Sequence, residues 1–195
     1  MRNRVARSRS MRGMSRRTLF SIIVPVVLVV AYFAITSGVR AHVSGLIEHS
    51  VNKPLPDFTL LDRAGKTWSK SDLAGKRAVV HFFRSHCHSC EVEAPAIREL
   101  EKNKPDDVIW LHVMTDVVLD VSKETTAATI ARKKFTEPIL MADEAFMDLF
   151  HKASWAQVTP VTYVVDAQGT VRYGLRGHQT MAAIHEAIDA AAKPQ

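Results

Sequence analysis

Two cysteines, Cys87 and Cys90, are the residues of this chain with the clearest capacity for chemistry. They are its only cysteines, and His88 and Ser89 separate them in the segment HFFRSHCHSCEVEAP, 81–95. Such a pair can form a structural disulfide, supply half of a metal site, or pass electrons by thiol–disulfide exchange. Which chemistry applies depends on the surrounding elements and on the compartment that the pair occupies.

The spacing of the pair favours electron transfer. A disulfide stabilises a fold mainly by closing a long loop, and this pair closes almost none. His86 and His88 add nitrogen ligands that zinc or copper would bind, but they flank Cys87 and would have to fold around one ion from neighbouring positions. Thiol–disulfide exchange needs only one thiolate to attack and a second thiol to resolve the mixed disulfide. We therefore expect a redox-active disulfide, Cys87–Cys90, with no metal and no cofactor.

The N-terminal segment predicts a membrane anchor. Residues 1–47 carry eight Arg and no acidic residue, so the net charge of +6 belongs to this tail, and the near-neutral remainder gives no reason to expect a nucleic-acid partner. Leu19–Val39 is a run of 21 uncharged residues, long enough as a helix to span the roughly 30 Å core of a bilayer. The arginines before it place the N-terminus in the cytoplasm.

These observations divide the chain into a basic cytoplasmic tail, an anchor, a tether and a domain outside the cytoplasm, in the periplasm or an equivalent space. The expected boundaries are 1–18, 19–39, 40–50 and 51–195. Two other interpretations stay open. The leader could be a cleaved signal peptide, although its apolar run is longer than the roughly 7–15 residues usual there. It could also be a mitochondrial presequence, with the inner membrane of that organelle as the location.

The domain reads as alternating strands and helices that end in a hairpin and a helix, which predicts a mixed-sheet α/β layer architecture. The expected strands of the sheet are 78–83, 108–114, 139–141 and the hairpin 161–175. The expected helices are 91–103, 122–135, 144–152 and 180–192, and two short strands around a turn at 64–65 precede the first long strand.

The cysteines lie between the first long strand and its helix, where the start of the helix favours the thiolate form of a cysteine. We expect Cys87 to be exposed there and Cys90 to lie one turn behind it.

Three motifs in this order resemble the membrane-anchored thioredoxin-like proteins of the TlpA/ResA/CcmG type. The opening VNKPLPDFTLLDRAGKTWSKSDLAGKRAVVHFF is similar to the N-terminal hairpin extension and first long strand of that family. CHSCEVEAP is similar to its C-x-x-C-x-x-E-x-P signature and maps Glu93 onto the family's active-site acid. VTPVTYVVDAQGTV resembles its cis-proline segment, which implies that Pro160 lies against the disulfide with Thr159 before it.

The resemblance implies a thioredoxin-like fold and exchange with protein disulfides. Its suggested clients are an apocytochrome c or a metal-site assembly factor, and a reductase of this kind implies a membrane electron donor of the DsbD or CcdA type. His86 departs from the family, which usually has Trp there, and His88 could stabilise the Cys87 thiolate and make the disulfide more oxidising. A disulfide-forming oxidase therefore stays an alternative, as does a Sco-like copper metallochaperone.

Several other residues have simpler interpretations. Glu93 could be an ordinary solvated residue, but its register one turn past Cys90 favours a proton acceptor for the Cys90 thiol. His81 reads as a hydrogen-bonded core histidine, and His112 receives no function. Trp155 could border the groove near Pro160, and Arg84 stands where a peroxiredoxin would have Thr.

Overall fold

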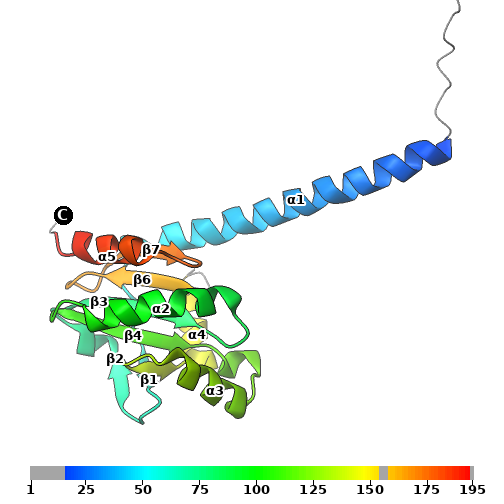
Figure 1. Ribbon diagram of the computed structural model, residues 1–195. Coiled ribbons are helices and arrows are strands. Elements are labelled where there is room, and N and C mark those ends of the chain that lie inside the picture. Colours follow the sequence, from blue (N-terminus) through cyan, green and yellow to red (C-terminus); the bar gives the residue numbers. More distant parts are fainter. Residues whose placement is uncertain (1–15, 154–157, 194–195) are drawn as a thin grey trace, which may run out of the picture. The chain divides into compact units, whose positions relative to one another are not determined.

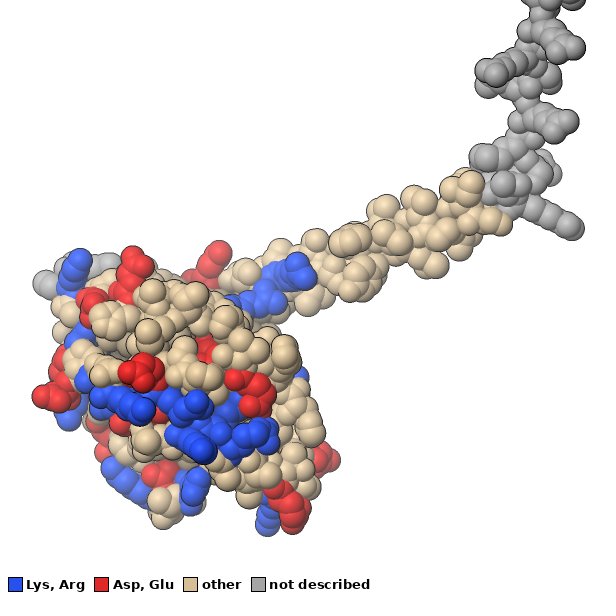
Figure 2. Space-filling view, in the orientation of Figure 1, with Lys and Arg blue, Asp and Glu red and all other residues tan. Residues whose placement is uncertain are grey.

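The computed structural model describes residues 16–153 and 158–193, in two units that are treated separately (Figure 1). The first unit, 1–41, contributes most of helix α1, Arg16–Ser50. By its length and composition, this helix is long and apolar enough to cross a membrane. Figure 2 shows a surface without charged side chains along most of its described length.

The last turns of α1 belong to the second unit, 42–195. Ile47 is only 4% exposed and joins the core of this unit, and the Ser50 hydroxyl donates a hydrogen bond to the Ile47 carbonyl. The segment 40–50, which the sequence suggested as a tether, is therefore helical, and its end packs as part of the domain.

The predicted mixed sheet is present. Strands β3, β4 and β5 are parallel, and β6 and β7 run antiparallel, in the order β5-β4-β3-β6-β7. A separate antiparallel hairpin of β1 and β2 precedes them, as expected. The strands are β1 Thr59–Leu61, β2 Thr67–Ser69, β3 Arg77–Phe83, β4 Val108–Met114, β5 Ile139–Met141, β6 Val161–Val165 and β7 Val171–Arg176.

Helices lie on both faces of this sheet. They are the short 3-10 helix η1 Lys70–Leu73, α2 His88–Lys102, the 3-10 helix η2 Val117–Leu119, α3 Lys123–Lys133, α4 Glu144–Lys152 and α5 Met181–Ala190. Helix α2 begins three residues before the predicted start, because Cys87 caps it. The strand and helix bounds otherwise follow the expected ones within a few residues.

Alternation along the fully buried strand β3 separates two cores. Ala78, Val80 and Phe82 point to one face and pack with the N-terminal hairpin and α4. The intervening residues of β3 point to the other face, where α2, α3 and α5 cover the sheet. Parallel strands place their carboxyl ends together, so the loops after β3 and β4 meet at one edge, where α2 begins.

Candidate active site

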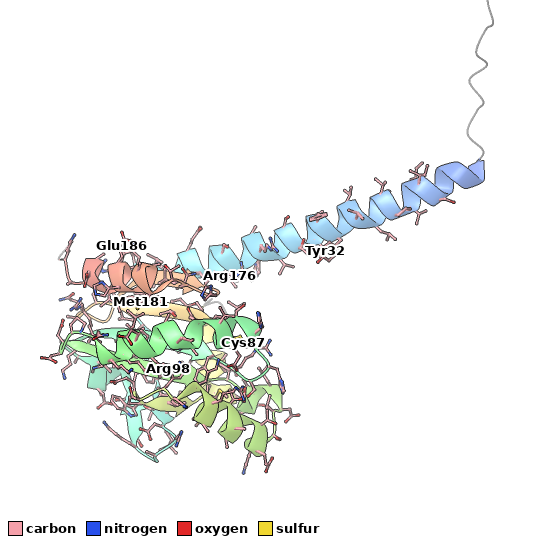
Figure 3. All side chains as sticks on the ribbon, viewed as in Figure 1. Tyr32, Cys87, Arg98, Arg176, Met181 and Glu186 are labelled. Carbon is pink, nitrogen blue, oxygen red and sulfur yellow. A yellow bond between two sulfur atoms is a disulfide. The ribbon has the colours of Figure 1, made fainter. Side chains whose placement is uncertain are left out.

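Cys87 and Cys90 form a disulfide, with an S–S distance of 2.03 Å and a Cα–Cα distance of 5.2 Å. Cys87 is the N-cap of α2, and its sulfur accepts a hydrogen bond from the main-chain N–H of Cys90 at 3.2 Å. Figure 3 shows Cys87 at the start of this helix. A donor on the sulfur and the positive end of the helix both favour a thiolate at this position.

The expectation that Cys87 is exposed is wrong. It is 8% exposed and Cys90 is 2% exposed, and both pack with Phe83, Met114 and Ile130. The order of accessibility is nevertheless the expected one, because Cys90 lies deeper. The loop that leads to the pair, 84–87, follows β3 directly, and both cysteines pack against core residues of β3, β4 and α3.

Hydrogen bonds hold that loop to the neighbouring loops. The main-chain N–H and the hydroxyl of Ser85 donate to the buried carboxylate of Asp116, at 2.7 and 2.6 Å. Arg84 Nε donates to Thr159 Oγ1 at 3.0 Å. His86 sits between these anchors and Cys87 with a left-handed φ of 52°, a conformation uncommon for a residue with a side chain.

The Thr159–Pro160 peptide bond is cis, as the motif implied. The Pro160 carbonyl accepts a hydrogen bond from the N–H of Gly177 at 2.8 Å, which joins the proline loop to the end of β7. The bond from Arg84 to Thr159 brings this loop beside the segment that leads to Cys87. Trp155, expected near the groove, lies outside the described residues.

A groove of about 530 Å³ opens beside Thr159. Its walls are mainly apolar, and its polar residues are Arg84, Thr115 and Thr159. The lining residues are Phe82, Arg84, Thr115, Val118, Leu119, Met147, Val158 and Thr159.

His86 and His88 are both exposed. Within 16–153 and 158–193, no group of three or more His, Cys, Asp or Glu side chains is placed to hold a metal ion.

Glu93 lies one turn past Cys90 on α2 and is completely buried. Its Oε1 accepts a hydrogen bond from the main-chain N–H of Gln179 at 3.1 Å. Its Oε2 lies 3.4 Å from Nε2 of His81, and neither of these two atoms has a hydrogen-bond partner among the described residues. The interpretation of Glu93 as an ordinary solvated residue does not fit this position.

His81 and His112 stand opposite each other on β3 and β4, and their Nδ1 atoms are 2.9 Å apart. Nε2 of His112 lies 2.7 Å from Oε1 of Glu101, a second buried carboxyl group on α2. The prediction of a hydrogen-bonded core histidine therefore holds for only one nitrogen of His81. His112, to which the sequence assigned no function, connects that histidine to Glu101.

Burial lowers the pKa of His112 to about 4, because the protonated ring would lose its hydration, and the hydrogen bond to Glu101 only partly opposes this. Burial alone would raise the pKa of Glu101. Hydrogen bonds from His112 and from the main-chain N–H groups of Glu137 and Thr136 outweigh burial and lower that pKa. His112 is therefore neutral at pH 7, and one proton lies between its Nε2 and Oε1 of Glu101.

Lys133, which the sequence analysis did not single out, places a buried cation next to the main chain of Cys90. The Lys133 ammonium donates to the Cys90 carbonyl at 2.5 Å and lies 3.2 Å from Oε2 of Glu91. Its side chain is 1% exposed, and burial lowers the pKa of Lys133 while Glu91 opposes that shift. In the sequence, Lys133 is one of several basic residues near the end of α3, so no signal separated it from its neighbours.

Comparison with known proteins gives a consistent result. The model of the AhpC/TSA family matches residues 51–174. Thiol-disulfide oxidoreductase YkuV of Bacillus subtilis is 25% identical over 149 residues, which cover 71% of this chain and 94% of that protein. Thiol-disulfide oxidoreductase ResA of Bacillus cereus is 23% identical over 171 residues, which cover 87% of this chain and 94% of that protein.

The fold is shared with solved structures as well. A thiol:disulfide interchange protein of the thioredoxin family from Chlorobium tepidum superposes with a TM-score of 0.62 at 21% identity, over 72% of this chain and 96% of that one. The chain therefore belongs to the AhpC/TSA family, and, like these relatives, it is a thiol–disulfide oxidoreductase with a thioredoxin-like fold.

Proposed function

We propose that this protein is a membrane-anchored reductase of protein disulfides outside the cytoplasm, with Cys87 as the attacking thiol and Cys90 as the resolving thiol. The observation that carries the proposal is the asymmetry of the pair. Cys87 caps α2 and receives the Cys90 N–H on its sulfur, whereas Cys90 is the more deeply buried of the two. A stabilised, more accessible thiolate suits attack, and a protected thiol one turn away suits resolution.

The exchange proceeds in two balanced steps. The Cys87 thiolate attacks one sulfur of the client disulfide, the client S–S bond breaks, and the other client sulfur leaves as a thiolate. Cys90 then loses its proton and attacks Cys87, so that the Cys87–Cys90 bond forms and the first client sulfur leaves with its electron pair. The client is reduced by two electrons, and the protein dithiol is oxidised to the disulfide.

The groove beside Thr159 is the proposed place for the client chain. Its apolar walls suit side chains next to a cysteine, and the Arg84–Thr159 contact ties its rim to the segment that carries Cys87. Thr159 and Pro160 would position the client main chain. The resemblance to the TlpA/ResA/CcmG type supports an apocytochrome c or a metal-site assembly factor as client and a DsbD- or CcdA-like electron donor.

Anchoring by 19–39 with the N-terminus in the cytoplasm completes the proposal. The length and apolarity of α1 support it, as do the arginines that precede the apolar run. Protease added to sealed spheroplasts should digest the domain and leave the N-terminal tail protected. A mature N-terminus near His42 would contradict the anchor.

Trapping tests the exchange itself. The Cys90→Ala variant should accumulate a mixed disulfide on Cys87 with its client, and the Cys87→Ala/Cys90→Ala variant is the matched control. Absence of any adduct at normal expression would refute exchange with proteins. The direction follows from the reduction potential. A value near the roughly −270 mV of thioredoxin supports a reductase, and one near −120 mV indicates a disulfide-forming oxidase.

A further inference from the structure

The resolving thiol poses a problem of proton transfer. If Cys90 resolves the mixed disulfide, as proposed above, its proton must go to a group inside the protein, because Cys90 is 2% exposed. Glu93 is one turn away on the same face of α2. A buried carboxylic acid, however, accepts a proton only if it can first become ionised, and ionisation without a partner is costly at a buried site.

A continuous chain of ionisable groups leads away from Glu93. It runs from Glu93 Oε2 to His81 Nε2 at 3.4 Å, from His81 Nδ1 to His112 Nδ1 at 2.9 Å, and from His112 Nε2 to Glu101 Oε1 at 2.7 Å. All four side chains are buried. We call these four residues the buried chain.

We propose that His81 and His112 form a proton relay between Glu93 and Glu101, which lets Glu93 become the acceptor for the Cys90 proton. The proposal rests on the proposed function, in which Cys90 resolves the mixed disulfide.

Counting protons supports this assignment. The contacts from His81 to His112 and from His112 to Glu101 are hydrogen bonds that hold one proton each. Oε2 of Glu93 and Nε2 of His81, which have no other partner among the described residues, face each other at 3.4 Å and can share a third proton. Starting from the neutral His112 that donates to Glu101, His81 must donate from Nδ1, and Glu93 must donate to Nε2 of His81. If all three protons shift by one contact, Glu101 becomes protonated and Glu93 becomes a carboxylate, while both histidines stay neutral.

The step then balances with the exchange. Glu93, now ionised, takes the proton of Cys90. The Cys90 sulfur attacks Cys87, and the electron pair of the broken bond leaves on the client sulfur. When the disulfide is reduced again, Glu93 returns the proton to Cys90 and the three shared protons shift back.

Other charged or polar groups at the chain are consistent with this role. Lys133 of α3 donates to the Cys90 carbonyl, and the carboxyl group of Glu93 partly opposes the lowering of the Lys133 pKa by burial. The main-chain N–H of Gln179, before α5, donates to Oε1 of Glu93. At the far end, Glu137 and Lys104 flank Glu101, and the depressed pKa of His112 keeps that ring neutral, as both arrangements of protons require.

Glu101→Gln is the sharpest test. The amide keeps the volume and can still accept from His112, but it cannot take a proton. It also lies eleven residues from Cys90, about 16 Å along the helix, so a local effect on the thiol is excluded. Val79→Ala, at a buried position two residues before His81 on the same face of β3, is the control for lost packing.

The assay uses the reduced full-length chain in detergent and dithiobis-nitrobenzoate, which releases one coloured thiolate when Cys87 attacks and a second when Cys90 resolves. In Glu101→Gln and in His81→Phe, the first phase should match the native rate. The second should be slower by about 10–100-fold at pH 7, since a general base contributes at least that much. In these two variants, the rate of the second phase should also rise by about tenfold per pH unit, like the thiolate fraction of an unassisted thiol. In the native chain and in Val79→Ala, the rate of the second phase should depend less steeply on pH.

The outcomes separate the two proposals. A native chain without a first phase would refute exchange through Cys87. A normal first phase with a second phase that is equally fast and equally pH-dependent in Glu101→Gln would overturn the relay alone. If the variants do not fold, nitrogen NMR of the native histidine rings decides. The protonated nitrogen of His81 should change between the reduced and oxidised chain, and the same tautomer in both would overturn the relay.

Discussion

Replacing His88 with proline tests whether the imidazole next to Cys87 makes the disulfide more oxidising. His88 is the first residue of α2, directly after the N-cap, and proline is well tolerated at this position because the N–H it removes has no partner within the helix. The substitution should therefore leave the fold intact. It removes the imidazole next to Cys87 in the chain, which in its protonated form would stabilise the thiolate of the reduced protein.

The size of the shift follows from exposure. His88 is exposed, so water screens its charge, and such surface interactions contribute about 0.3–1 kcal/mol. Since 30 mV corresponds to about 1.4 kcal/mol for two electrons, the reduction potential should fall by about 6–20 mV. Equilibration with glutathione redox buffers measures it, with His86→Ala as a comparison for the other flanking histidine. The difference should vanish at pH 9, where the imidazole is neutral. No shift at pH 6, or a shift that persists at pH 9, would refute the reasoning.

Three further predictions concern the core. Gly174→Ala should destabilise the domain by about 1–3 kcal/mol, because the added methyl group collides with Ile47 of α1; urea unfolding should show partial rescue by Ile47→Ala, and strictly additive losses would contradict the contact. Lys133→Met should lower the reduction potential by about 20–40 mV, equivalent to 1–2 kcal/mol, by removing the buried cation behind the disulfide; exposed Lys134→Met is the control, and equal shifts would exclude a specific role. Because the folded-state pKa of His112, about 4, lies below the usual 6.5, only the unfolded chain binds this proton between these values. The free energy of unfolding should then fall by about 2 kcal/mol from pH 7 to pH 5, and His112→Phe should remove that part of the dependence.

Much of the fold could be predicted because its signals are local. The strand 108–114 has the predicted bounds, since a continuous apolar run limited by polar residues marks a strand covered on both faces. The cysteine pair was identifiable for the same reason, as its spacing and position between a strand and a helix are local features. The predicted start of α2 lies three residues after the observed start, because cysteine is not among the usual N-cap residues.

The buried chain was out of reach for a physical reason. His81 and His112 lie 31 residues apart and meet only because β3 and β4 are neighbours in one particular register. A shift of one residue would turn one ring to the opposite face of the sheet. The burial of Lys133 could not be predicted from the sequence, because it depends on how α3 packs against α2. No pattern within either helix determines that packing.

The distribution of buried charge over the two faces of the sheet supports a chemical role for the buried chain. The face that carries Phe82 packs against an apolar core with α4 and the N-terminal hairpin. The ionisable side chains of the chain, and Lys133, lie on the other face, under the helix that bears the cysteines. Replacing buried ionic groups with apolar ones of similar volume is often neutral or stabilising, so stability alone gives little reason for them. A strand that already supplies Phe82 and Phe83 could supply an apolar residue at position 81 equally well. A histidine between Glu93 and His112 is instead what proton transfer requires. Its burial is unfavourable for stability, and it occurs on the face of the sheet that α2 and its cysteines cover.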